Sequence, residues 1–416
     1  MRSTTVWPAL LGVEKTVVER VEFDEDEEML VAHVRPRRRS RSRCGICRRP
    51  CPGYDRGEGR RRWRALDLGL FRAFVEADAP RVSCPEHGVV VAHVPWARHD
   101  ARHTLPFDDT VAWLATRTSK STLEQLLRIA WRTVGAIVSR VVAEGAAQRD
   151  PLAGLARIGI DEISYKRGHR YITLVVDHDS GRLVWAAPGR DRKTLAKFFD
   201  ALGETRCAAI THVSADAATW IADEVADKCP NAVRCADPFH IVAWATDALD
   251  EVRRETWNTA RKEGFGGHAR DLKHARYALW KNPEDLTKKQ AAKLAWIAKV
   301  NHRLYRAYLL KEQLRQVFAL KGEDGKRLLD HWLAWARRCR IPAFVHLAQR
   351  IAKHRISINA SLEHRLSNGL VESTNTKVRL LTRMAFGFKS PEAMIALAML
   401  NLGGYCPPLP GRRAAA

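Results

Sequence analysis

The sequence lacks any long apolar segment. No run of about 18 apolar residues, the length needed to cross a bilayer, occurs in the 416 residues. The opening segment, MRSTTVWPALLGVEK, also lacks an apolar stretch adequate for a secretory signal. We therefore expect no membrane span and a cytoplasmic location.

Acidic residues are few relative to basic ones. The chain has 47 Asp and Glu against 70 Lys and Arg, which gives a formal net charge of +23 and a sequence pI near 10. Such a charge attracts polyanions, and nucleic acid is the commonest large one. Ribosomes or acidic membranes are alternative partners, but we favour nucleic acid.

The composition excludes a largely disordered chain, because 46% of the residues are hydrophobic and 13 are Trp. The length allows two to four domains. In a cytoplasmic protein, nine cysteines indicate thiols or metal ligands rather than disulfides.

The N-terminal region, residues 1–100, combines strands with a basic segment. Alternation around Val17 and Val21, followed by the apolar residues 29–34, predicts a hairpin. The arginine-rich residues 35–43 come next, and they are either phosphate-binding or a solvated loop.

Two pairs of metal-ligand residues follow, each with a spacing of two residues: Cys44-Gly-Ile-Cys47 and Cys84-Pro-Glu-His87. This spacing lets both ligands of one turn reach the same tetrahedral ion, so we predict a zinc ribbon with a structural zinc ion held by Cys44, Cys47, Cys84 and His87. Cys51 either replaces one ligand or is a spare thiol. The alternative is that these cysteines are unrelated and that His87 lies on the surface.

Residues 101–150 read as three helices in a basic context. We predict helices over 105–118, from a capping box at residues 121–124, and from near Thr133. Short helices joined by tight turns fit a helix-turn-helix DNA-binding domain. The residues expected to face the major groove are Arg132, Thr133 and Arg140.

Residues 155–240 read as strands and helices in the order βββαβαβ. The first strand carries Asp161 at its far end, and the fourth strand, over 208–215, delivers Asp216. A short fifth strand ends at Asp237, which is a rival to Asp216. We favour Asp216 because it ends the longer and more apolar strand. This order predicts an α/β ribonuclease-H-like catalytic domain with a mixed sheet.

The rest of the chain is mainly helical. Residues 241–360 read as a long all-helical insertion whose tryptophans are core residues, and residues 361–405 as the last helices of the catalytic domain. Glu372, Asn375 and Arg379 fall on one polar face of a helix. The tail, residues 406–416, is expected to be disordered.

Asp161, Asp216 and Glu372 suggest metal-dependent phosphodiester chemistry. Carboxylate oxygens suit Mg²⁺, and clustered like charges repel unless a metal offsets them. One ion activates a water or a 3′-hydroxyl, and the other stabilises the leaving oxygen.

The chain resembles bacterial insertion-sequence transposases of the DDE class, of the ISL-three (ISL3) family. The matching stretches are GIDE, SADA, ADPFHI and NGLVESTNTKVRLLTRMAFGF, which contain Asp161, Asp216, Asp237 and Glu372 respectively. The zinc ribbon and the helix-turn-helix belong to the same layout, so the resemblance covers nearly the whole chain. The second knuckle differs from the usual family pattern. Two cysteines are commoner at these positions, whereas this sequence has Cys84 and His87.

The resemblance implies a catalytic triad of Asp161, Asp216 and Glu372 that holds two Mg²⁺ or Mn²⁺ ions. It implies cleavage at the element's ends followed by strand transfer to target DNA. The N-terminal modules would bind the terminal inverted repeats, and Asn375, Lys377 and Arg379 would position DNA phosphates. A homodimer or larger assembly on DNA, associated with the bacterial nucleoid, is expected. The alternatives are a DNA-binding regulator with a decayed catalytic domain, or a ribonuclease-H-like nuclease without strand transfer.

Overall fold

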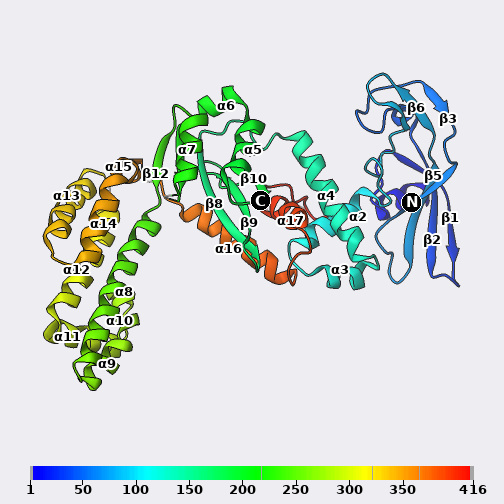
Figure 1. Cartoon of the computed structure of the whole chain (residues 1–416). Helices are drawn as coiled ribbons and strands as arrows, with labels where there is room; N and C mark the ends of the chain where they lie inside the picture. The colour runs from blue at the N-terminus through cyan, green and yellow to red at the C-terminus, as the bar shows by residue number, and fades with distance from the viewer. Residues whose placement is uncertain (1–2, 217, 321, 365, 413–416) are drawn as a thin grey trace. The chain divides into compact units, whose positions relative to one another are not determined.

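The computed structural model describes residues 3–216, 218–320, 322–364 and 366–412 (Figure 1). It divides into two compact units. Unit 1 comprises Met1–Pro151 together with Val378–Ala416, and unit 2 comprises Leu152–Lys377. Among the described residues, no helix has the length and apolar character needed to cross a membrane.

Unit 1 begins with two small sheets. The four-stranded sheet has the order β1-β2-β5-β4, with β1 (Thr16–Asp24), β2 (Met29–Pro36), β4 (Arg60–Arg64) and β5 (Arg72–Asp78). The three-stranded sheet consists of β3 (Gly53–Asp55), β6 (Arg81–Cys84) and β7 (Gly88–Val91). Strands β1 and β2 form the predicted hairpin, and α1 (Ser3–Leu10) precedes them. Trp63 and Trp96 are buried in the core of this region and contact each other edge to face.

Three helices follow in unit 1: α2 (Leu105–Ala115), α3 (Lys120–Leu127) and α4 (Trp131–Gln148). The predicted capping box at residues 121–124 is wrong. Ser119 caps α3, because its side chain accepts a hydrogen bond from the Thr122 backbone N–H. The first helix is also shorter than predicted, since it ends at Ala115.

The C-terminal residues of unit 1 pack against these helices. Leu397 and Leu400 of α17 (Pro391–Leu402) share a hydrophobic cluster with residues of α2 and α4. Tyr405 is buried, and a Cβ on Gly145 would lie 2.5 Å from its ring. In the expected disordered tail, residues 406–412 are described and Cys406 packs against this cluster, whereas residues 413–416 lie outside the described residues.

Unit 2 is built on a five-stranded mixed sheet of order β10-β9-β8-β11-β12. Strands β8 (Arg157–Lys166), β9 (Arg170–Asp177) and β10 (Leu183–Pro188) are antiparallel, whereas β11 (His212–Ala215) and β12 (Val233–Ala236) run parallel to β8. Asp161 therefore does not end its strand as predicted, because pairing with β9 carries β8 on to Lys166. The predicted strand over 208–215 is also too long, since residues 204–209 form α6 (Glu204–Ala209).

Helices cover both faces of this sheet (Figure 1). Apolar side chains of β8 and β11 pack against α5 (Arg192–Leu202) and α7 (Thr219–Lys228) in one cluster. On the other face lie α15 (Arg355–His364), which contacts β12, and the start of α16 (Gly369–Met384).

The helical insertion runs from α8 to α14 and has its own hydrophobic core. Its tryptophans pack in or against this core, as predicted; Trp332 is fully buried and donates its indole N–H to the Leu310 carbonyl at 2.8 Å. The helices are α8 (Pro238–Lys262), α9 (Gly266–Lys273), α10 (Arg276–Trp280), α11 (Lys288–Val300), α12 (His302–Leu320), α13 (Gly322–Arg338) and α14 (Pro342–Lys353).

Candidate functional site

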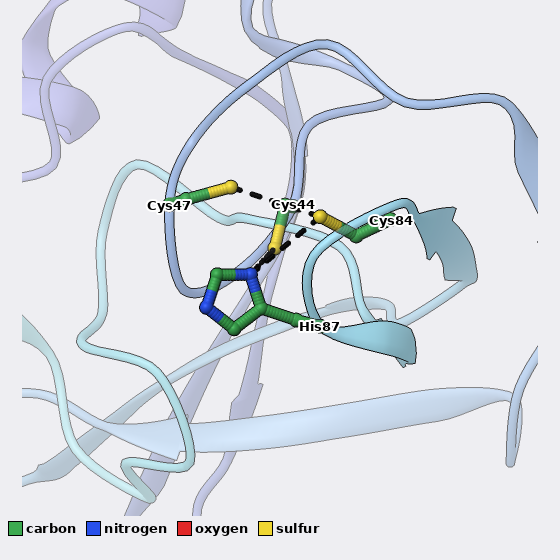
Figure 2. A group of neighbouring side chains, drawn as sticks. All are labelled: Cys44, Cys47, Cys84 and His87. Atoms are coloured by element: carbon green, nitrogen blue, oxygen red, sulfur yellow. Dashed lines mark hydrogen bonds between the residues drawn. The ribbon is translucent and has the colours of Figure 1, made fainter.

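Three cysteines and one histidine of unit 1 gather around one point (Figure 2). The ligand atoms of Cys44, Cys47, Cys84 and His87 all lie within 4.8 Å of one another. His87 Nδ1 is 3.8 Å from Cys44 Sγ and 3.6 Å from Cys84 Sγ, and the Cys47 and Cys84 sulfurs are 3.8 Å apart. A tetrahedral site with Zn–S bonds of about 2.3 Å has ligand–ligand edges of about 3.8 Å. The donor set and its spacing therefore fit a structural zinc ion.

The local backbone explains why these four side chains meet. In the first knuckle, the Ile46 N–H donates to Cys44 Sγ at 3.4 Å. In the second knuckle, Cys84 ends β6 and pairs with Gly88 of β7, so the turn between them returns His87 to the same point. The hydrogen bond with His87 lowers the pKa of the Cys84 thiol to about 6, which favours the thiolate that zinc binds.

Cys51 is not a member of this group. It is buried beside the cluster, and its thiol donates to the Arg49 carbonyl at 3.4 Å. Burial raises its pKa, which keeps it a neutral thiol. Of the two readings of Cys51, the geometry favours the spare thiol.

The second candidate site lies on the sheet of unit 2, where Asp161 stands within β8 and two further aspartates directly follow the neighbouring parallel strands β11 and β12. The register pairs Ala215 with Ile160 of β8 and with Ala236 of β12. The next residues along the three strands are Asp161, Asp216 and Asp237. Because side chains at equivalent positions of parallel strands point to the same face, the sheet directs all three carboxylates to one side.

Helix α16 approaches this face at Gly159, two residues before Asp161. A Cβ on Gly159 would lie 2.4 Å from Val371 Cγ2 and 3.1 Å from Ser214 Oγ, so only glycine leaves room for the helix. One turn beyond Val371, the Asn375 side chain donates to Asp161 Oδ2 at 2.8 Å. Glu372 lies between these two contacts and is half-buried.

Burial and neighbouring charges raise the pKa values of several groups at this site. Burial raises the pKa of the Asp161 carboxyl, and the Asp216 carboxylate raises it further. Burial also raises the pKa of Glu162 to about 7, with Asp161 and Asp216 adding to the effect. His240 supplies a nearby positive charge, because its hydrogen bond with Asp237 and the surrounding carboxylates raise its pKa to about 9. Carboxylates arranged in this way gain stability from a bound cation.

Asp216 and Asp237 differ in their surroundings. Asp237 is buried, caps α8 by accepting from the Phe239 N–H at 3.4 Å, and accepts from His240 Nδ1 at 2.8 Å. Asp216 is half-buried. The reason given for preferring Asp216 is wrong, since β11 and β12 have the same length of four residues. The better reason is that the Asp237 carboxylate already serves a structural role.

Sequence reasoning missed two residues of this site. His240 stands in the ADPFHI stretch, and a Pro at the first helical position after Asp237 indicates a helix start that brings residue 240 back to the cap. Asn368 is fully buried; its Oδ1 accepts from Ser214 Oγ at 2.5 Å, and its N–H donates to Asp237 Oδ1 at 3.4 Å. No pattern in the sequence indicates these contacts, because they join residues more than a hundred positions apart.

Asp161, Asp216 and Glu372 are not packed as tightly as the zinc ligands. Among the described residues, only the Cys and His group has three or more ligand atoms all within 4.8 Å of one another. Mutual repulsion of carboxylates keeps them apart unless a cation lies between them.

The residues predicted to contact DNA lie in different settings. Arg132 is exposed and Thr133 half-buried at the start of α4. Arg140 donates to the buried carboxylate of Asp108 at 3.2 Å. On α16, Lys377 and Arg379 are exposed, whereas Asn375 is buried and binds Asp161. DNA contact by these six residues stays a prediction.

Comparison with protein families matches almost the whole chain, in three segments. Residues 40–87 match a family described as a zinc-finger of the transposases IS204, IS1001, IS1096 and IS1165. Residues 92–142 match the helix-turn-helix domain of transposase family ISL3, and residues 158–398 match a transposase domain.

Full-length relatives agree with these matches. The chain is 62% identical to the transposase for insertion sequence element IS1557 of Mycobacterium tuberculosis, over 99% of this chain and 98% of the relative. It is 26% identical to the transposase for insertion sequence element IS1001 of Bordetella parapertussis, over 90% of this chain and 92% of the relative.

Proposed function

Because the chain belongs to the ISL3 family of insertion-sequence transposases, we propose that it cuts DNA at the ends of its element and joins the freed ends to target DNA. The catalytic residues in this proposal are Asp161, Asp216 and Glu372. The observation that carries it is the register of β8 and β11, which pairs Ile160 with Ala215, the residues directly before Asp161 and Asp216. Helix α16, which bears Glu372, contacts β8 through the hydrogen bond from Asn375 to Asp161.

The three carboxylates are suited to Mg²⁺ or Mn²⁺, which prefer oxygen ligands and keep several waters. Burial raises the pKa of the Asp161 carboxyl, and the Asp216 carboxylate raises it further; a bound cation would favour the charged form of both groups, which supports this fit. When bound, two such ions activate the attacking water or 3′-hydroxyl and stabilise the leaving oxygen. Asp161 and Asp216 hold the ions from the sheet, and Glu372 completes one site from α16.

Asn375 and His240 support this arrangement. The amide of Asn375 fixes the orientation of the Asp161 carboxylate. His240 holds Asp237, and its positive charge offsets part of the repulsion between the acids. Gly159 lets α16 come close to β8 at Val371, the residue directly before Glu372.

We also propose that the core of unit 2 has the ribonuclease-H-like fold. The observed succession β8-β9-β10-α5-α6-β11-α7-β12 has the predicted order βββαβαβ, apart from the short α6. The long helical insertion then separates β12 from α16, as expected for residues 241–360.

In unit 1, we propose that the zinc ribbon and the helix-turn-helix bind the terminal inverted repeats. The recognition helix in this proposal is α4, and its N-terminal residues Arg132, which is exposed, and Thr133, which is half-buried, would contact base edges in the major groove. Pairing of two element ends calls for a homodimer or a larger assembly on DNA. We expect the protein to act in the bacterial cytoplasm, where its DNA substrate lies.

The test is a cleavage and strand-transfer assay with labelled element-end DNA and Mg²⁺. Wild type is compared with Asp161→Asn, Asp216→Asn and Glu372→Gln at saturating protein. We expect all three variants to bind DNA and to make neither product. Cleavage without a joined product would indicate a nuclease, and binding without cleavage by wild type would indicate a DNA-binding regulator.

A further inference from the structure

A strongly basic hollow of about 790 Å³ lies in unit 1. We call it the arginine hollow. It is formed by the loop before β1, the loop between β2 and the first zinc knuckle, the knuckle itself, and the segment after β7. Its basic lining residues are Lys15, Arg37, Arg38, Arg43, Arg48 and His93.

Little of this charge is neutralised. Glu14 is the one acidic residue in the lining, and Arg48 has a loose ion pair with Glu144 at 3.5 Å. Within the described part of the chain, Lys15, Arg37 and Arg38 have no carboxylate within 4.0 Å, and all three are exposed. Burial lowers the pKa of His93, and Arg48, Arg43 and Lys15 lower it further, which reflects the positive field in the hollow.

A neighbouring hollow of unit 1 is also lined by arginines, so the neutralisation of arginines can be compared between the two hollows. It has a volume of about 540 Å³ and shares His93 with the arginine hollow. Three of its four arginines are paired with acids: Arg35 with Glu19 at 2.9 Å, Arg60 with Glu76 at 2.8 Å, and Arg81 with Asp55. The fourth, Arg41, donates to the Pro36 carbonyl at 3.3 Å. Most arginines of this hollow are therefore neutralised, whereas Lys15, Arg37 and Arg38 of the arginine hollow have no carboxylate within 4.0 Å among the described residues and are available to an anion.

The loops around the arginine hollow are held in an uncommon backbone conformation. Lys15, Ser42 and Arg48 have φ angles of 54°, 53° and 59°, in the left-handed region that non-glycine residues seldom adopt. Lys15 also accepts a hydrogen bond at its carbonyl from the Arg37 N–H at 3.0 Å, which ties two of the loops together. Such strain concentrates at functional sites, and it argues against a freely solvated loop.

The hollow is continuous with the helix-turn-helix. Leu105, the first residue of α2, is part of its lining, and Glu144, the partner of Arg48, lies on α4. A DNA duplex bound at α4 therefore has this positive surface beside it.

We propose that the arginine hollow binds the phosphodiester backbone of duplex DNA, next to the segment that the helix-turn-helix reads. The proposal rests on the proposed function, since it takes DNA as the substrate. Contacts to phosphates carry no base specificity but fix the register and orientation of a protein on the duplex. The hollow thus anchors the element end, while α4 reads it.

The test measures the affinity of the full-length protein for an element-end duplex and for a random duplex across a range of salt concentrations. The variant is the double substitution Arg37→Gln and Arg38→Gln. The matched control is Arg56→Gln with Arg102→Gln, two exposed arginines of unit 1 outside the lining. Zinc content and melting temperature are measured for each protein.

The loss of two phosphate contacts should lower the slope of log K against log salt by about 1.8, since each contact contributes about 0.9. At 0.1 M salt this corresponds to a loss of roughly 60-fold in affinity, equal for both duplexes. The control pair should keep a slope near that of wild type. A double variant with the slope of the control would overturn the proposal, as would weaker binding to anionic vesicles or to structured RNA with unchanged binding to DNA.

Acetylation of Lys15 in the wild-type protein gives a second readout that needs no substitution. Duplex DNA should protect this amine, whereas equal labelling with and without DNA would contradict the proposal even if the double variant failed to fold. Cleavage by wild type is measured in parallel. If wild type neither binds nor cuts DNA, the proposed function fails; if it does both and Lys15 is unprotected, the arginine hollow alone is excluded.

Discussion

Asp161 and Asn375 are 214 residues apart in the sequence, and their side chains meet in a hydrogen bond of 2.8 Å. This contact joins the central strand of the sheet in unit 2 to the helix that carries Glu372. It therefore orients the Asp161 carboxylate and holds α16 against β8.

Asn375→Ala should lower the rate of DNA cleavage by roughly 10- to 100-fold, the usual cost of removing the partner of a metal-binding carboxylate. The measurement is single-turnover cleavage of element-end DNA with Mg²⁺. Thr376→Ala, an exposed position of the same helix, is the control and should be unaffected. A wild-type rate for Asn375→Ala would mean that the contact is incidental.

Asp216 and Asp237 should respond differently to substitution. Asp216→Asn should abolish cleavage and leave the free energy of unfolding unchanged, because the side chain is half-buried. Asp237→Ala should lower the free energy of unfolding by about 1–3 kcal/mol, since it removes a helix cap and leaves the buried N–H of Asn368 unpaired. Urea unfolding and the cleavage assay separate the two effects. An active Asp216→Asn with an inactive but stable Asp237→Asn would reverse the assignment.

Gly159→Ala should destabilise unit 2 by about 1–3 kcal/mol, because the new methyl group would lie 2.4 Å from Val371 Cγ2. Relief of the clash moves α16 away from the sheet, so cleavage should fall as well. Gly267→Ala is the control, since its Cβ would meet nothing within 4 Å. Thermal unfolding and cleavage of both variants are compared with wild type. A wild-type melting temperature and cleavage rate for Gly159→Ala would show that the close contact of α16 with β8 is not required.

The sequence predicts the periodic elements of this protein better than their ends. The hairpin of β1 and β2 and the burial of the tryptophans of residues 241–360 agree with prediction, because alternation and amphipathic spacing act locally. The end of β8 depends on its pairing with β9, and the start of α3 depends on which of two serines caps it. Neither choice is encoded in the periodicity.

In the candidate sites, too, the sequence predicts what depends on local spacing and does not predict what depends on tertiary contacts. Spacing alone predicts the ligands Cys44, Cys47, Cys84 and His87, but whether Cys51 replaces one of them is decided only by the folded knuckles. Asp161 and Asp216 are suggested by strand ends, whereas Asn368 is brought to Ser214 and Asp237 by the packing of α16. Tertiary contacts of this kind leave no local signature in the sequence.

Removal of zinc should unfold the zinc ribbon of unit 1. A small module of this kind draws much of its folding free energy from the metal, so a chelator should abolish its melting transition and leave that of unit 2 in place. Metal analysis should find zinc in the wild-type protein and in Cys51→Ser, and should find it lost in Cys44→Ser. If Cys44→Ser kept its zinc and Cys51→Ser lost it, Cys51 would be the zinc ligand in place of Cys44.

Arg132 and Arg140 provide the last prediction, because both were expected to contact DNA and only Arg140 has a buried partner. Burial raises the pKa of Asp108 to about 6, and Arg140 and Arg98 favour its charged form. Arg140→Ala should therefore cost about 1–3 kcal/mol in the free energy of unfolding of unit 1, since it leaves a buried carboxylate less well compensated. Arg132→Ala removes an exposed side chain, so stability should be unchanged while affinity for element-end DNA falls.

Urea unfolding and DNA binding are measured for both variants. A stable Arg140→Ala with weakened DNA binding would place Arg140 in the DNA interface after all, whereas unchanged DNA binding by Arg132→Ala would remove the start of α4 from it.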